Sequence, residues 1–282
     1  MLTIDSHQHF WPEPLIGALS RSTEAPRLRN GSLELAVEGA FPVDLEEHDL
    51  ARRLALLDRH DIDTALISLA PTMEVDGRHD LIEAYHLGML EIAAASNGRL
   101  RPLAYGECRE EFAGTCVSAL ALVNGIEPLL SEVEAAGQML FVHPGPPTSL
   151  PSRAPRWWAA VAEYTRQMQS AFLAWVTRDA ERHARLPVVF AILAGGGPIQ
   201  LERLGSRGVE VPSAAHENAY FDTASYGRRA LELCVAAVGS GQLVFGSDAP
   251  TLDPGAGLRA VAELGHAFAR SVCGDNPTKV LA

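Results

Sequence analysis

The strongest constraint on the fold is an alternation of short apolar runs with helical patterns that continues through all 282 residues. Segment 45–62, for example, repeats leucines at the helical period, and segment 63–71 then gives an apolar strand ended by proline. Nearly continuous apolar strands separated by helices are typical of a parallel sheet covered by helices. Eight such strands are expected, at residues 2–10, 63–71, 100–108, 116–123, 138–147, 186–197, 219–227 and 242–251.

Eight strand–helix units in a chain of this length predict an α/β fold, a single (β/α)8 TIM-type barrel domain over residues 1–282. A doubly wound open sheet is the alternative, but no glycine-rich dinucleotide loop follows the first strand. Residues 12–44, which are rich in proline and arginine, are interpreted as a loop.

Composition narrows the class of protein. Aspartate and glutamate outnumber lysine and arginine by 35 to 23, and the net charge of −12 argues against nucleic acid as a partner. No apolar run approaches the roughly 18 residues of a membrane span, and no signal peptide is evident. A cytoplasmic protein without membrane association is therefore expected.

Polar residues gather where three of the expected strands end. The first strand ends in His7-Gln8-His9, and alternate side chains on a strand share a face. The fifth ends in His143, and Asp248 follows the eighth. Each residue alone has a structural explanation, such as an aspartate capping a helix. Since barrels build their active sites at the carboxyl ends of the strands, the four together predict a site for one divalent metal ion.

The motifs around these residues resemble those of the amidohydrolase superfamily, in particular its amidohydrolase 2 group of aromatic-acid decarboxylases and of sugar-acid and pyrone lactonases. The segments IDSHQHF, LFVHPGPP and FGSDAP are similar to the signatures of strands one, five and eight, and YFDTAS to that of strand seven. The resemblance implies that His7, His9, His143 and Asp248 are the metal ligands. Zinc is expected, with manganese as the alternative.

Two departures from the family pattern matter. Members with two metals bridge them with a carboxylated lysine on strand four or an acidic substitute, but the single lysine here is Lys279, near the C-terminus. A lysine-bridged pair of metals is therefore excluded. Many relatives also carry a histidine at the end of strand six, where this chain has Ala194.

Three functions remain open at this stage. The first is a hydrolase of a small cyclic ester or amide, in which Asp248 is both ligand and general base for a metal-bound water. The alternative is a non-oxidative decarboxylase of an aromatic or unsaturated acid. The third is a barrel that binds a ligand without catalysis, which only the loss of the strand-six histidine supports.

Residues that bind substrate are less visible in the sequence. Arg27 and Arg29 could pair with the carboxylate of a small-molecule substrate, and Tyr226 lies beyond strand seven on the same rim. Trp11 fits either a pocket wall or the core. Histidines 48, 60, 79, 86 and 183 lie in helical patterns and are expected to be solvated. The oligomeric state is not determined, although homodimers are common.

Overall fold

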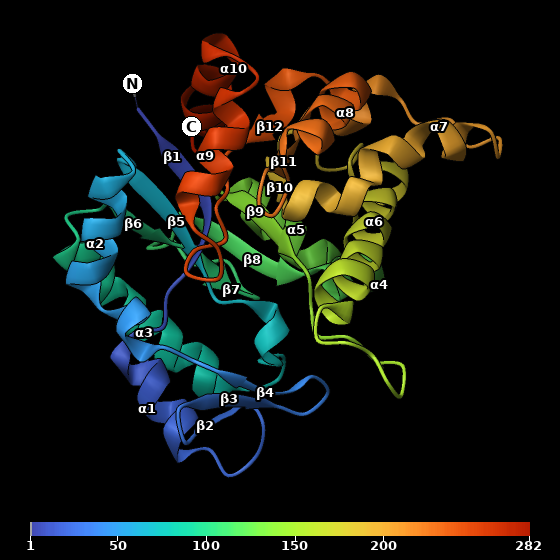
Figure 1. Cartoon of the computed structure of the whole chain (residues 1–282). Helices are drawn as coiled ribbons and strands as arrows, with labels where there is room; N and C mark the ends of the chain where they lie inside the picture. Colours follow the sequence, from blue (N-terminus) through green and yellow to red (C-terminus); the bar gives the residue numbers. More distant parts are fainter. Residues whose placement is uncertain (1) are drawn as a thin grey trace.

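The computed structural model describes residues 2–282, apart from the side chains of residues 213 and 214, and it confirms the α/β fold with parallel strands. Eight parallel positions follow one another in chain order around the sheet (Figure 1). They are β1 (Ile4–His9), β5 (Thr64–Ser68), β6 (Leu100–Pro102) continued by β7 (Ala104–Tyr105), β8 (Gly114–Ser118), β9 (Met139–His143), β10 (Val188–Phe190), β11 (Ala219–Asp222) and β12 (Leu243–Val244).

Backbone hydrogen bonds join the two ends of this sheet. The amide of Ser6 donates to the carbonyl of Phe245 at 2.7 Å, and that of His9 to the carbonyl of Ala249 at 2.7 Å. In return, the Asp248 amide donates to the His7 carbonyl at 2.8 Å. Leu103 is the one residue between β6 and β7, and its amide donates to the Ile67 carbonyl of β5. β6 and β7 therefore form one strand position, and the closed ring has the connectivity of a (β/α)8 barrel.

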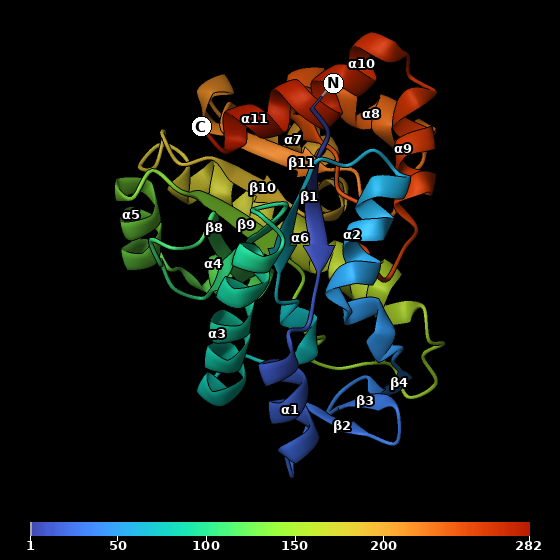
Figure 2. The same cartoon turned by 90° about the vertical axis from the view of Figure 1, so that its left-hand side faces the viewer.

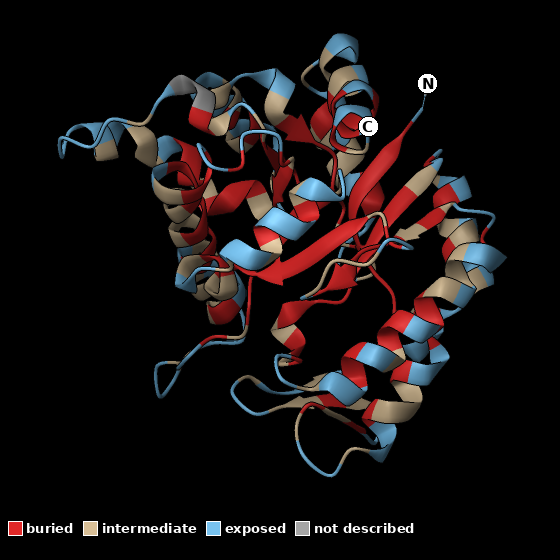
Figure 3. Cartoon of the chain, turned by 180° about the vertical axis from the view of Figure 1, so that it is seen from behind, coloured by how far each residue is buried: buried red, intermediate tan, exposed pale blue. Residues whose placement is uncertain are grey.

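Helices cover the outside of the barrel, and their inward faces and the strands are buried (Figure 3). The α-helices are α1 (Glu13–Arg21), α2 (Leu50–Arg59), α3 (His79–Ala95), α4 (Ala119–Asn124), α5 (Glu127–Ala135), α6 (Tyr164–Ala174), α7 (Gln200–Gly205), α8 (Arg228–Val238), α9 (Pro254–Ala262), α10 (His266–Arg270) and α11 (Asn276–Val280). No helix among the described residues is both long and apolar enough to cross a bilayer.

The expectation of a loop over residues 12–44 is wrong. The segment forms α1 and a three-stranded antiparallel sheet of β2 (Arg27–Arg29), β3 (Ser32–Leu35) and β4 (Gly39–Pro42). Asn30 and Gly31 both have positive φ and make the two-residue turn between β2 and β3. An Asn-Gly pair is a strong hairpin signal that the sequence analysis missed. The β1 arrow points toward this small sheet, which therefore lies at the carboxyl ends of the barrel strands (Figure 2).

The expected strand at residues 116–123 is also only half correct. Its second half is helix α4, because the Ser118 side chain accepts a hydrogen bond from the Ala121 amide at 3.2 Å and caps that helix. Lys279 lies on α11, at the end of the chain.

Candidate metal centre

Three imidazole rings converge at the carboxyl end of the barrel. His7 and His9 come from β1 and His143 from the last position of β9, and all three are buried. One ring nitrogen from each lies within 4.8 Å of those of the other two, and the Nε2 atoms of His7 and His9 are 3.1 Å apart. The strand geometry expected from the His-x-His spacing therefore places both rings on one face.

The other ring nitrogen of each histidine is held by an oxygen that can only accept. Nδ1 of His7 lies 2.8 Å from Asp222 Oδ2, that of His9 is 2.9 Å from the Ser68 carbonyl, and that of His143 is 2.9 Å from the Pro144 carbonyl. These bonds place the protons on Nδ1, so each neutral ring directs an unprotonated Nε2 atom into the site. Oxygen acceptors behind ligand histidines are the usual support of a metal centre.

Asp248 lies beside two of these rings. Its Oδ1 atom lies 3.2 Å from His9 Nε2 and 3.6 Å from His7 Nε2. With metal–nitrogen bonds of about 2.0–2.1 Å, neighbouring ligands around a tetrahedral zinc ion are roughly 3.4 Å apart. The residue has a φ of 63°, in the left-handed region, and its amide bonds to His7, which ties the carboxylate to the histidine strand.

The electrostatics of the site favour a positive charge. Burial opposes protonation of His7, but Asp222, with smaller effects of Asp248 and Asp5, raises the pKa of His7 to about 9. Burial and the neighbouring His7 and His9 lower the pKa of His143. The carboxylates near these rings would likewise favour a divalent cation bound between them. The three convergent nitrogen atoms suit one such ion, and the Asp248 carboxylate lies next to two of them.

Asp222 is the part of this centre that the sequence analysis did not assign. It ends β11 within YFDTAS and is fully buried. One oxygen holds His7, and the other accepts the amides of Ile192 at 2.9 Å and of Ala224 at 3.0 Å. A carboxylate at the end of a barrel strand was the available signal.

A second group of potential ligands, Glu83, His86 and Glu107, does not suit a metal. Nε2 of His86 accepts the Tyr105 amide at 2.8 Å, so Nδ1 must carry the proton of the neutral ring. That Nδ1 atom faces Glu107 Oε1 at 3.3 Å, and Arg109 already pairs with both glutamates. The group is thus an ion-pair network around a buried histidine.

The metal centre opens into a cavity of about 560 Å³. Its lining is largely apolar and includes Trp11, Met73 and Ile192, with Phe41 and further residues of the small sheet. His48 also lines it and is buried rather than solvated, stacked on Trp11 with ring centroids 4.6 Å apart and accepting the Trp11 amide. His86 and His183 are likewise buried, in contrast to the expectation.

The predicted substrate-binding residues do not line this cavity. Arg27 pairs with Glu34 at 2.6 Å on the small sheet, and Arg29 is exposed beside the Ser22 carbonyl. Tyr226 is partly buried against the core, and its neighbour Ser225 reaches the cavity instead. Their role in substrate binding stays a prediction.

The strand-six end is an unusual turn. Ile192, Leu193 and Ala194 have φ of 47°, 51° and 50°, and Gly195 and Gly196 continue the left-handed path. Such conformations are unfavourable for residues with a Cβ and are typical of functional sites. Ala194 is fully buried, and Ile192 provides the cavity contact here.

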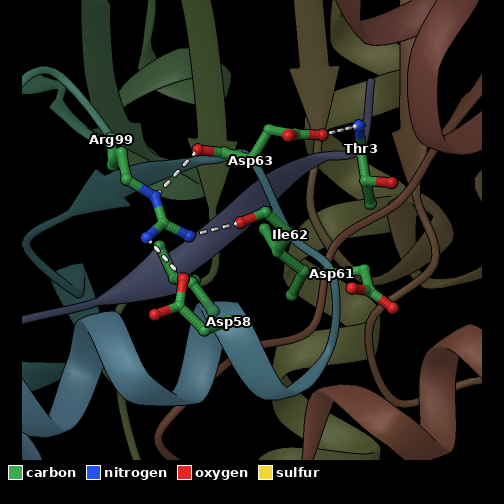
Figure 4. Close-up of a pocket in the computed structure, with 7 residues that line it drawn as sticks. Thr3, Asp58, Asp61, Ile62, Asp63 and Arg99 are labelled. Atoms are coloured by element: carbon green, nitrogen blue, oxygen red, sulfur yellow. Dashed lines mark hydrogen bonds and ion pairs between the residues drawn. The ribbon is translucent and has the colours of Figure 1, made fainter. Parts of the chain in front are cut away.

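A second cavity, of about 590 Å³, lies at the opposite end of the barrel (Figure 4). Arg99 donates to Asp58 Oδ1 at 2.6 Å and to the carbonyls of Ile62 and Asp63. The Asp63 carboxylate in turn accepts the Thr3 amide at 2.7 Å. Arg99, the cation of this cavity, is thus already engaged in an ion pair with Asp58.

Fold and site thus define a barrel with a candidate metal centre, and comparison with known proteins gives its family. The family model described as Amidohydrolase matches residues 4–282, and the chain belongs to that family, in its amidohydrolase 2 group. No curated protein matches the sequence.

Three solved structures illustrate the likeness of fold. The apo IDCase of Metarhizium anisopliae has a TM-score of 0.82 at 21% identity, covering 99% of this chain and 97% of that one. The 5-carboxyvanillate decarboxylase LigW of Sphingomonas paucimobilis has a TM-score of 0.74 at 19% identity, covering 99% and 98%. That of Novosphingobium aromaticivorans, with bound manganese and 3-methoxy-4-hydroxy-5-nitrobenzoic acid, has a TM-score of 0.74 at 17% identity, covering 99% and 97%.

These similarities contradict one expectation. The prediction of a hydrolase of a cyclic ester or amide is wrong, because the similar structures that are named for a particular substrate are decarboxylases. The alternative, a non-oxidative decarboxylase, is the better interpretation.

Proposed function

We propose that this protein is a metal-dependent, non-oxidative decarboxylase of an aromatic or unsaturated carboxylic acid. The observation that carries the proposal is the convergence of three histidine nitrogen atoms and Asp248 at the end of a largely apolar cavity. An apolar cavity suits the body of a planar acid, and the cation site suits its carboxylate. The decarboxylases of similar fold support this choice of reaction.

His7, His9, His143 and Asp248 would hold the divalent ion. When bound, the ion would neutralise the substrate carboxylate and a neighbouring oxygen and so orient the acid. Manganese is present in similar structures, and three imidazoles with one carboxylate also suit zinc. The metal is therefore manganese or zinc in this proposal.

The chain's own contribution to the reaction is a proton. When the bond between ring and carboxylate breaks, carbon dioxide leaves and the electron pair stays on the ring carbon. That carbon must then accept one proton. Asp248 is the proposed carrier of this proton: its carboxylate, 19% exposed at the site, takes a proton from solvent and passes it to the ring carbon, whereas Ala194 offers no acid or base.

Arg156 is the candidate that attracts the acid. It is the one arginine or lysine that lines the cavity within the described part of the chain, and no carboxylate described there lies within ion-pair distance of it. A long, planar cation at the entrance favours a carboxylate over a neutral analogue.

The experiment is a screen with the manganese- or zinc-loaded protein against 2,6-dihydroxybenzoate, 5-carboxyvanillate and other aromatic and unsaturated acids in D2O. The expected result is release of carbon dioxide with one deuterium on the carbon that carried it, and no release by His143→Ala. Arg156→Gln should raise KM about tenfold with little change in kcat. If the loaded protein releases no carbon dioxide from any of these acids, the proposal fails.

A further inference from the structure

The small sheet contributes a wall of the cavity that the barrel strands do not provide. Leu33 and Leu35 of β3 and Phe41 and Pro42 of β4 line it, together with Glu38 from the turn between these two strands. The sheet lies at the carboxyl ends of the barrel strands (Figure 1). A substrate held at the metal centre therefore has this hairpin among its neighbours.

The tip of the hairpin is fixed to the barrel. The amides of Ala36 and Val37 donate to the two oxygens of Glu74, at 2.6 and 2.9 Å. Glu74 follows the short 3-10 helix η2 (Pro71–Met73) beyond β5, and its φ of 59° belongs to the left-handed region. Two backbone amides bound to one carboxylate leave the turn little freedom, so the position of Glu38 is defined.

Glu38 meets a tyrosine from the other side of the cavity. The Tyr164 hydroxyl, at the start of α6, donates to Glu38 Oε1 at 2.5 Å, and both residues line the cavity and are half-buried. Burial, the Glu38 carboxylate and Asp248 raise the pKa of Tyr164, so the phenol remains a donor. Burial, and secondarily Glu74, raises the pKa of Glu38.

The second oxygen of Glu38 is available. Among the described residues, Tyr164 is the group that donates to this side chain, and no arginine or lysine lies within ion-pair distance. A half-buried carboxylate without a cation attracts a hydrogen-bond donor and repels a second carboxylate. These are the properties of a group that discriminates between substituents.

We propose that Glu38, oriented by Tyr164, determines substrate specificity by accepting a hydrogen bond from a hydroxyl or N–H substituent of the acid. A carboxylate that reaches the same wall is rejected. The substrate class is thus an acid with one carboxylate at the metal centre and an uncharged donor facing the hairpin. This inference rests on the proposed function, because the metal centre sets the orientation of the ligand.

The test uses the manganese-loaded protein and 2-nitrophenol as a non-reacting probe, whose adjacent hydroxyl and nitro groups suit a metal ion. Derivatives carry either a hydroxyl or a carboxylate at each free ring position. Titration calorimetry at pH 8 measures their affinities. For the position that reaches the hairpin, we expect the hydroxyl derivative to bind at least about tenfold more tightly than the carboxylate derivative.

Glu38→Gln should reduce this ratio to below about threefold, and Tyr164→Phe should lower it less. Glu24→Gln is the matched control, an exposed glutamate between α1 and the small sheet that lies outside the cavity, and should leave the ratio unchanged. A ratio that Glu38→Gln does not alter, or equal affinity of wild type for both series, overturns the inference, as does the absence of binding by every probe.

The two proposals fail separately. Probe affinity needs no turnover, so an unchanged ratio with normal carbon dioxide release removes the role of Glu38 and keeps the decarboxylase. Absence of carbon dioxide release from every acid removes the proposed function even where the probes bind. Thermal unfolding of both variants shows whether a lost preference reflects a lost fold.

Discussion

The two ends of the barrel carry cavities of similar volume, about 560 and 590 Å³, and both contain several carboxylates. At the amino end of the strands, Arg99 is bonded to Asp58, Ile62 and Asp63. At the carboxyl end, three imidazoles are oriented by acceptors behind them and leave their Nε2 atoms facing one point. Volume therefore does not distinguish the two ends, whereas ring nitrogens from three residues that converge on one point do.

The largest expected effect comes from the loss of one candidate metal ligand at the carboxyl end. His143→Ala removes one ligand nitrogen and leaves the other residues in place, and metal affinity should fall by more than about 100-fold. Activity should fall with it, because no protein group replaces the cation. Equilibrium dialysis with manganese and zinc measures the affinity, and an affinity within threefold of the wild type would remove His143 from the ligand set.

The next effect distinguishes a metal ligand from Asp222, the residue that holds the ligand His7 in place. Asp222→Asn keeps the shape, but an amide has one acceptor oxygen where the carboxylate has two. That oxygen can accept a hydrogen bond from His7 Nδ1–H or from the amides of Ile192 and Ala224. The NH2 group, itself a donor, then faces the remaining donors and makes no hydrogen bond with them. Metal affinity should fall by about 10- to 100-fold, less than for His143→Ala. Dialysis under the same conditions compares the two, and an unchanged affinity would contradict the supporting role.

The dependence of stability on pH tests a residue of the cavity at the carboxyl end, His48. Burial, with Arg53 and His9, lowers the pKa of His48 to about 3 in the folded chain, whereas an unfolded histidine titrates near 6.5. The unfolded state therefore binds the proton first. The contribution of His48 is complete above pH 6.5 and is lost as the pH falls toward 3.

Between pH 7.5 and 5, this loss amounts to about 2 kcal/mol of the free energy of unfolding. His48→Gln keeps an acceptor for the Trp11 amide and does not titrate. Urea unfolding of the metal-free proteins at both pH values should show a smaller loss for the variant by that amount. Equal losses for both proteins would show that His48 is not a buried neutral ring.

The smallest effect belongs to the amino end. Arg99→Gln removes a partly exposed ion pair and two hydrogen bonds to carbonyls, and the free energy of unfolding should fall by about 1 kcal/mol. Metal affinity and carbon dioxide release should stay within twofold of the wild type. A loss of either would mean that this end takes part in function.

The sequence predicts the barrel because eight apolar strands leave few alternatives, and it predicts where His7, His9 and His143 meet because strand ends share one rim. It does not predict Asp222, whose importance lies in a bond to a residue 215 positions away. The residues of the cavity wall cannot be predicted from the sequence for a related reason. Glu38, Tyr164 and Arg156 come from a turn of the small sheet, a helix start and a loop, and their meeting depends on packing that no local pattern encodes.

The turn between β2 and β3 is a different case, because its Asn-Gly pair could have been recognised in the sequence, but the prolines around it favoured the interpretation as a loop. The type of reaction could not be predicted from the sequence either, because the ligand motifs resemble those of both the lactonases and the decarboxylases of this family.

The most direct test of the central claim is the metal content per chain of protein purified without chelator, compared between wild type and His143→Ala by plasma mass spectrometry. We expect close to one manganese or zinc ion per wild-type chain and almost none in the variant. Equal content in both proteins, or a wild-type chain that neither contains nor takes up metal, would contradict a metal centre at His7, His9, His143 and Asp248.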